Sequence, residues 1–193
     1  MRIVRTCLIV GFVLAVLLVT GCGESEGPGP QVHNYDIDEA RAMARPLGKV
    51  WNTDAVNWIV NGRMLDEQGR LVSDGTHWQF WYSVNGTDHH VVQVNSTGQT
   101  EEWDQQVGQS GENPMVEVDY TDSKINQLLG IAATEIKQQF GAADQEYVYF
   151  LQLIKGGDNY ADIKAYDSAA IGTQVGHIRL IAETGQVDYR DWD

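Results

Sequence analysis

Two stretches of the chain pass through the same order of patterns, and this internal repetition limits the fold more than any other feature. Residues 34–38 and 119–123 each open a helical pattern, while residues 92–99 and 179–186 each end an apolar run in Thr-Gly. The same order of elements lies between these landmarks in both stretches. A long unit with matched ends indicates duplication, so we expect two tandem repeats.

Each repeat is predicted to begin with a helix. An apolar stripe with helical spacing marks the second helix: Ile125, Leu128, Leu129, Ala132, Ile136 and Phe140. Thr121 or Asp122 can cap its start, and Gly141 is placed to end it. The first helix, over residues 37–50, contains Pro46, which should kink or split it.

Strands are predicted to follow each helix. They are expected at residues 58–65, 78–84, 90–95, 147–154, 163–166, 177–182 and 186–189. Residues 78–84 alternate most regularly, which puts Trp78 and Phe80 on one face and Gln79 and Trp81 on the other.

These elements predict an α+β fold of two tandem repeats, each a helix packed on an antiparallel sheet of three to four strands. The repeats would span residues 35–106 and 119–193, joined by a linker at 107–118 that contains Gly and Pro. They would form either two small domains or one pseudo-symmetric body.

The N-terminus has the layout of an export signal over residues 1–21. Arg2 and Arg5 precede an apolar run at residues 7–19, which is shorter than the roughly 20 residues of a transmembrane helix. Residues 19–22, Val-Thr-Gly-Cys, resemble the lipobox of bacterial lipoproteins. The resemblance implies cleavage before Cys22 and attachment of lipid to its thiol; the alternative is an ordinary secreted protein with a chance cysteine. Gly23, in place of Asp, resembles an outer-membrane sorting signal if the host is Gram-negative.

Residues 22–34 read as a flexible tether, because their Gly and Pro residues prevent a regular element. The only other cysteine, Cys7, leaves with the signal, so the exported part has no disulfide and no free thiol for catalysis or zinc. With 13 basic and 27 acidic residues the formal net charge is −14. This charge excludes nucleic acid as a partner. It either keeps the protein soluble or favours cationic partners.

The order of helix and strands, closing on an apolar strand that runs into Thr-Gly, resembles the PepSY family. Residues 92–99 and 178–186 carry this likeness, although the family's usual Asp before Thr-Gly is absent from both. The resemblance implies an extracytoplasmic, non-enzymatic binding module of the kind found in protease propeptides and envelope lipoproteins. A weaker similarity is to secreted β-lactamase inhibitors built from tandem helix-on-sheet units.

No sequence motif indicates catalysis or a cofactor. His89 and His90 are adjacent, so in a strand they point to opposite faces and do not share a metal. His77 and His177 are isolated in sequence, and no Gly-x-Ser-x-Gly elbow occurs. Acidic clusters lack the spacing of a calcium loop and read as solvated surface.

The candidate binding surface comprises Trp81, Gln79 and Trp103, because exposed aromatic residues are favoured at interfaces. Packing in the core or between the repeats is the alternative role for Trp81. We therefore expect a lipoprotein anchored to the membrane through Cys22 on the exported side of a bacterial cell. It would bind an envelope protein without enzymatic activity and could regulate an envelope protease. A structural or assembly lipoprotein, and an unrecognised hydrolase or metal-binding protein, are the alternatives.

Overall fold

The structure, a computed structural model, describes residues 33–73, 75–107, 115–141, 146–156, 159–167 and 173–192. The predicted signal peptide, Cys22 and nearly all of the predicted tether lie outside these residues. The described elements follow the order α1 (Ile37–Trp51), β1 (Val56–Leu65), β2 (His77–Ser83), β3 (Asp88–Asn95), β4 (Thr100–Gln106), α2 (Asp122–Phe140), β5 (Tyr147–Ile154), β6 (Tyr160–Asp167), β7 (Gln174–Ile181) and β8 (Val187–Trp192).

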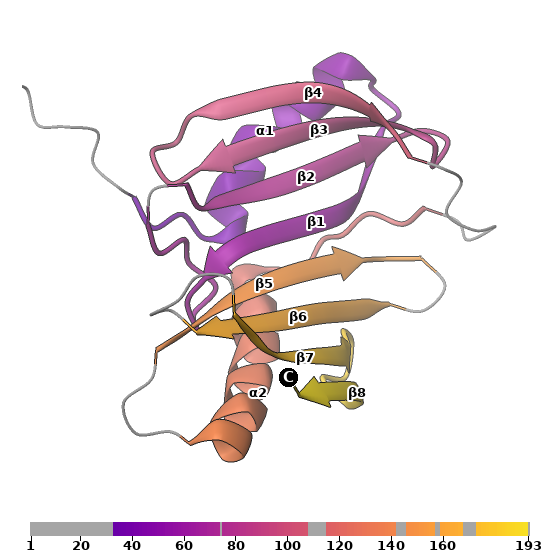
Figure 1. Cartoon of the computed structure of the whole chain (residues 1–193). Helices are drawn as coiled ribbons and strands as arrows, with labels where there is room; N and C mark the ends of the chain where they lie inside the picture. Colours follow the sequence, from indigo (N-terminus) through magenta and orange to yellow (C-terminus); the bar gives the residue numbers. More distant parts are fainter. Residues whose placement is uncertain are drawn as a thin grey trace, which may run out of the picture. The chain divides into compact units, whose positions relative to one another are not determined.

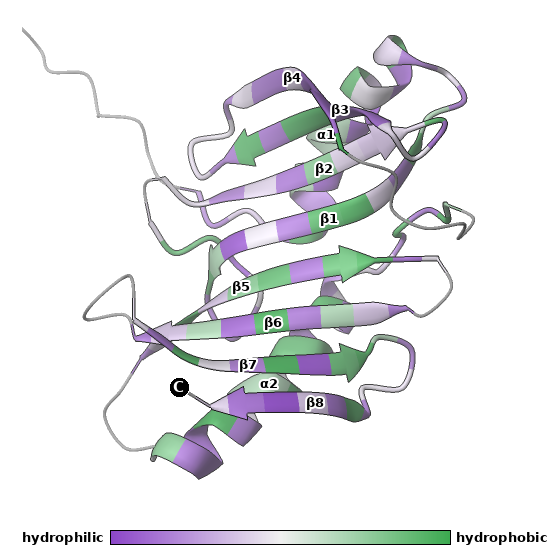
Figure 2. Cartoon of the chain, turned by 45° about the vertical axis from the view of Figure 1, so that its right-hand side comes forward, coloured by the Kyte–Doolittle hydropathy of each residue, from purple (hydrophilic) through white to green (hydrophobic). Residues whose placement is uncertain are grey.

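The eight strands form one antiparallel sheet in the order β4-β3-β2-β1-β5-β6-β7-β8 (Figure 1). Each strand pairs with its neighbour along the chain except at the centre, where β1 pairs with β5. Figure 2 shows hydrophilic residues concentrated on β4 and β8, the two edges of the sheet. Charged edge strands oppose pairing with other chains.

The expectation of two tandem repeats, each a helix on its own sheet, is wrong because a single sheet contains all eight strands. β1 and β5 hydrogen-bond to each other from the pair Ile59↔Ile154 to the pair Leu65↔Tyr149. Two separate sheets would have left both strands as edges with unpaired backbone N–H and C=O groups. Both strands are rich in apolar residues, so pairing them at the centre also buries side chains that an edge would expose.

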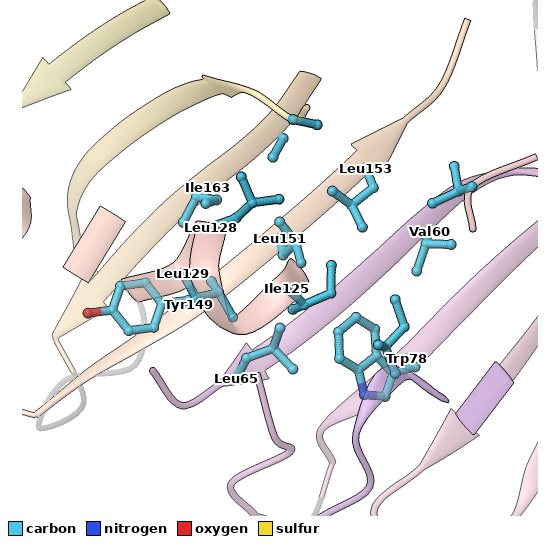
Figure 3. Packing of buried hydrophobic residues seen from close by; sticks show 14 of the residues in the cluster. Val60, Leu65, Trp78, Ile125, Leu128, Leu129, Tyr149, Leu151, Leu153 and Ile163 are labelled. Atoms are coloured by element: carbon cyan, nitrogen blue, oxygen red, sulfur yellow. The ribbon is translucent and has the colours of Figure 1, made fainter. Parts of the chain in front are cut away.

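Both helices pack on the same face of the sheet, which we call the helix face. α1 lies against β2 and β3, and α2 lies against β6 and β7. Figure 3 shows Ile125, Leu128 and Leu129 of α2 packed near Leu151 of β5 and Ile163 of β6, and all five are essentially inaccessible to solvent. Alternation along the strands puts these residues on the helix face and leaves the next residues on the opposite, open face.

The first turn of α1 is capped by its own side chains, whereas α2 has no such cap. At the start of α1, the Asp36 carboxylate accepts from the Glu39 N–H at 2.8 Å, and the Glu39 carboxylate accepts from the Asp36 N–H at 3.2 Å. α1 continues through Pro46 as one helix, so the predicted split does not occur. The N-cap residue of α2, Thr121, makes no side-chain cap bond.

Asp38 of α1 supplies the missing cap at the start of α2. Its Oδ2 accepts from the Asp122 N–H at 3.0 Å, and its Oδ1 accepts from Arg41 at 2.8 Å. At the other end, α2 stops at Gly141, whose φ is 95°, as the sequence predicts. A carboxylate at a helix N-terminus is favoured by the free N–H groups there, so Asp38 ties the two helices together.

The predicted strands are confirmed to within a few residues, and one further strand was missed. The missed strand is β4, which pairs with β3 along its whole length although six of its seven residues are exposed. Of the predicted linker, residues 108–114 lie outside the described part of the chain. Val118 within that linker is buried, and its N–H donates to the Asn57 carbonyl at 2.7 Å. The boundaries assigned at residues 106 and 119 stay a prediction.

Candidate ligand-binding groove

The open face of the sheet carries a groove of about 660 Å³ across five adjacent strands, β2, β1, β5, β6 and β7. Its lining combines polar, charged and aromatic side chains: Asn61, Arg63, His77, Gln79, Phe150, Gln152, Asp162, Lys164, His177 and Arg179. Gly62 and Leu151 also line it, in the central strands β1 and β5. Gly62 has no room for a side chain on the other face, because an added Cβ would lie 2.6 Å from both the Leu65 and the Trp78 side chains.

Strand register arranges four amide side chains in one row across the sheet, which we call the amide row, and three of them, Gln79, Asn61 and Gln152, line the groove. Gln93 of β3 lies opposite Gln79 of β2, Gln79 opposite Asn61 of β1, and Asn61 opposite Gln152 of β5. The Gln79 Nε2 donates to the Gln93 Oε1 at 3.0 Å, and the Gln152 Nε2 donates to the Asn61 Oδ1 at 3.1 Å. Neighbouring strands are about 4.8 Å apart, so the row presents an amide at each strand.

A second row, two residues further along the strands, is basic and aromatic, and we call it the basic row. It runs His77–Arg63–Phe150–Lys164–His177, each residue opposite the next. The Arg63 guanidinium lies over the Phe150 ring, 5.4 Å from its centroid. Burial, and then the positive charge of Arg63, lower the pKa of His77, so this imidazole is neutral at neutral pH.

Asp162 contacts two side chains of β7, Arg179 and His177, at the β6–β7 end of the groove. Its carboxylate accepts from Arg179 Nε at 2.9 Å and Nη2 at 3.2 Å, and its Oδ1 lies 3.0 Å from His177 Nε2. The hydrogen bonds to Asp162 raise the pKa of Arg179. The fork-to-carboxylate geometry fixes both side chains, so Asp162 stabilises the groove wall.

The structure places the predicted surface residues Gln79, Trp81 and Trp103 on the open face, but only Gln79 lines the groove. Trp103 of β4 lies opposite Val91 and is half-buried. Trp81 and Trp58 both pack against His89, with ring centroids 5.7 Å and 5.4 Å away. Trp81 is therefore a packing residue of an aromatic cluster beside the groove.

The adjacent histidines of β3, His89 and His90, lie in different environments. His89 and His90 point to opposite faces, as predicted: His89 stacks on Trp58 on the open face, and His90 stacks on Trp51 of α1 on the helix face. The Nδ1 and Nε2 of His90 lie 2.9 Å and 3.0 Å from the carboxylates of Asp104 and Glu102. In the described part of the chain, no group of three or more His, Cys, Asp or Glu residues is arranged to hold a metal ion.

Sequence reasoning missed most of the groove. It treated His77 and His177 as isolated, whereas the sheet brings them to the two ends of the basic row. A signal was present: Asn61 and Arg63 in β1, and Asp162 and Lys164 in β6, are polar residues that alternate with Gly or apolar residues. Such residues mark the solvent face of a half-buried strand, but only the register shows that they converge.

Comparison with known proteins gives no assignment. No protein-family model, no curated protein and no solved structure matches the chain. The resemblances to the lipobox and to the PepSY family therefore stay predictions. No helix in the described residues is long and apolar enough to cross a membrane.

Proposed function

We propose that this chain is an exported, lipid-anchored lipoprotein of the bacterial cell envelope that binds another envelope protein through its open-face groove and catalyses no reaction. The observation that carries the proposal is a groove with three cationic side chains, Arg63, Lys164 and Arg179, and one carboxylate, Asp162, in a chain of net charge −14. Cationic groups concentrated on one face of an acidic protein favour a partner of complementary charge there.

The side chains of the groove suit binding better than catalysis. His177 and Asp162 form a pair that could serve as base and orienter, but Arg179 holds the same carboxylate through two hydrogen bonds. None of the described residues that line the groove is Ser, Thr or Cys, the side chains that such a pair would activate. The PepSY resemblance makes an envelope protease the first partner to test.

Photo-crosslinking in intact cells tests the proposal. A photo-reactive amino acid would replace Gln152, which is exposed in the groove, or Gln138, which is exposed on α2. We expect a discrete protein adduct from position 152 and none of the same mass from position 138. The same adducts from both positions, or recovery of lipid alone, would contradict binding through the groove.

A further inference from the structure

We propose that the ligand of the groove is an extended acidic segment of a partner protein, whose carboxylates bind Arg63 and Lys164. This inference rests on the proposed function and adds the chemistry of the bound segment. Three observations support it. Arg63 and Lys164 form no ion pair with a described carboxylate, and their spacing fits an extended peptide. The amide side chains beside them have unused hydrogen-bonding groups, and the aromatic rings are covered by other side chains.

Several cationic side chains among the described residues already form ion pairs with carboxylates, whereas the two on the open part of the groove do not. Ion pairs join Arg41 to Asp38 at 2.8 Å, Lys155 to Asp119 at 2.7 Å, Arg190 to Glu135 at 2.8 Å and Arg179 to Asp162 at 2.9 Å. Arg63 and Lys164 form no ion pair with any described carboxylate, and both are exposed. Two unpaired cations on one open groove, in a chain with an excess of 14 acidic residues, are complementary to an acidic ligand.

The spacing of these two cations matches carboxylates three residues apart in an extended peptide. Arg63 lies opposite Phe150, and Phe150 lies opposite Lys164, so the two cations stand two strands apart. Two strand spacings are about 9.6 Å. A polyproline II segment has three residues per turn and rises about 3.1 Å per residue, which puts the carboxylates of residues i and i+3 on one side, about 9.3 Å apart.

The amide row supplies partners for the backbone of such a segment. The bonds between Gln79 and Gln93 and between Gln152 and Asn61 each use one amide donor and one carbonyl oxygen. The Gln79 and Gln152 carbonyl oxygens and the Asn61 amide nitrogen have no partner among the described residues. Free acceptors and a free donor in one row suit peptide N–H and C=O groups, which a polyproline II backbone leaves unpaired.

The aromatic rings of the groove favour a peptide over an acidic polysaccharide. Sugar rings stack on open aromatic faces, but the Phe150 ring has Arg63 over it and Tyr166 beside it, with ring centroids 4.5 Å apart. Beside the groove, the Tyr160 ring has Arg179 over it, 5.0 Å from its centroid. An arginine stacked on a ring still presents its N–H groups at its edge, so Arg63 keeps its capacity to bind a carboxylate.

Binding of a fluorescent peptide to the full-length protein in detergent tests this inference. The probe contains three Glu-Pro-Ala repeats, and a matched peptide replaces each Glu with Gln. The protein is compared with the double variant Arg63→Gln, Lys164→Gln. A control double variant, Arg45→Gln, Arg70→Gln, removes the same charge from exposed sites outside the groove; the Arg45–Glu117 ion pair at 3.7 Å is exposed and weak.

Fluorescence anisotropy at low ionic strength should show binding of the acidic peptide. The Gln peptide and the groove variant should each give affinity lower by about tenfold or more, because hydrogen bonds to charged groups are lost. The control variant should keep its affinity. Equal loss in both double variants would overturn the assignment to Arg63 and Lys164.

An acidic polysaccharide is the competing ligand, and alginate oligomers are its probe. If alginate binds through the same two cations more tightly than the peptide and displaces it, the peptide assignment is overturned. If no acidic probe binds while position 152 still crosslinks to a protein in cells, the acidic-segment inference fails and the proposed binding function stands.

Discussion

Gly48 is the point where α1 comes closest to the sheet, and its substitution gives a sharp test of the packing. A Cβ added at Gly48 would lie 2.6 Å from the Tyr82 Cγ and Cδ1 and 2.7 Å from its Cδ2. Tyr82 is 2 % exposed, so its ring has no solvent-filled space into which it could move. Gly48→Ala therefore forces the helix and the sheet apart or tilts the buried ring.

Two opposing effects determine how much Gly48→Ala changes the free energy of unfolding. Overpacking a core costs about 1–3 kcal/mol, and contact with a buried ring puts Gly48→Ala near the upper end. Replacing a helical Gly with Ala stabilises the helix by about 1 kcal/mol, so the free energy of unfolding should fall by about 2 kcal/mol in total. Gly130 in α2 is the matched control, because an added Cβ there meets nothing within 4 Å.

Urea denaturation measures both variants. Gly130→Ala should raise the free energy of unfolding by about 1 kcal/mol, so the two variants should differ by about 3 kcal/mol with similar m-values. Equal shifts of the midpoint in Gly48→Ala and Gly130→Ala would refute the close approach of α1 to Tyr82.

Three further predictions concern pH, helix capping and the anchor. Burial lowers the pKa of His89 in the folded protein. As the pH falls below about 6.5, His89 is protonated in the unfolded chain before it is protonated in the fold, so the folded state loses stability that it has at higher pH. His89→Phe, which keeps a ring against Trp58, should therefore flatten the decline in unfolding free energy between about pH 7.5 and 5.5; an unchanged slope would contradict this. Asp38→Ala should lower the free energy of unfolding by about 1 kcal/mol in urea, because the Asp122 N–H at the start of α2 loses its acceptor; an unchanged midpoint would show that the cap contributes nothing. Cys22→Ser should move the protein from the membrane to the soluble fraction of cells, and retention in the membrane would contradict anchoring through that thiol.

Local periodicity allowed much of the secondary structure to be predicted. The stripe from Ile125 to Ile136 and the stop at Gly141 gave α2, and the apolar run at residues 147–154 gave β5 with its bounds. β4 was missed because it has little apolar alternation: as an edge strand it needs only the backbone of β3, and its exposed side chains bury little surface.

The single sheet and its groove depend on information that local patterns do not contain. Helical and strand periodicity identify β1 and β5 as apolar strands, but they do not show that the two strands pair with each other. The groove depends on that pairing, because Arg63 of β1 and Lys164 of β6 share a row only when β5 lies between them. A shift of one residue in the register would send these side chains to the helix face.

The central claim is that the protein acts by binding a partner through the open face of this sheet. Photo-crosslinking from position 152 in intact cells tests it most directly when it is repeated in three backgrounds: unchanged, Arg63→Gln with Lys164→Gln, and Arg45→Gln with Arg70→Gln. We predict a protein adduct of one mass in the unchanged and control backgrounds and its loss in the groove variant. An adduct of equal yield in all three would contradict recognition through Arg63 and Lys164, and no adduct in any background would contradict the central claim.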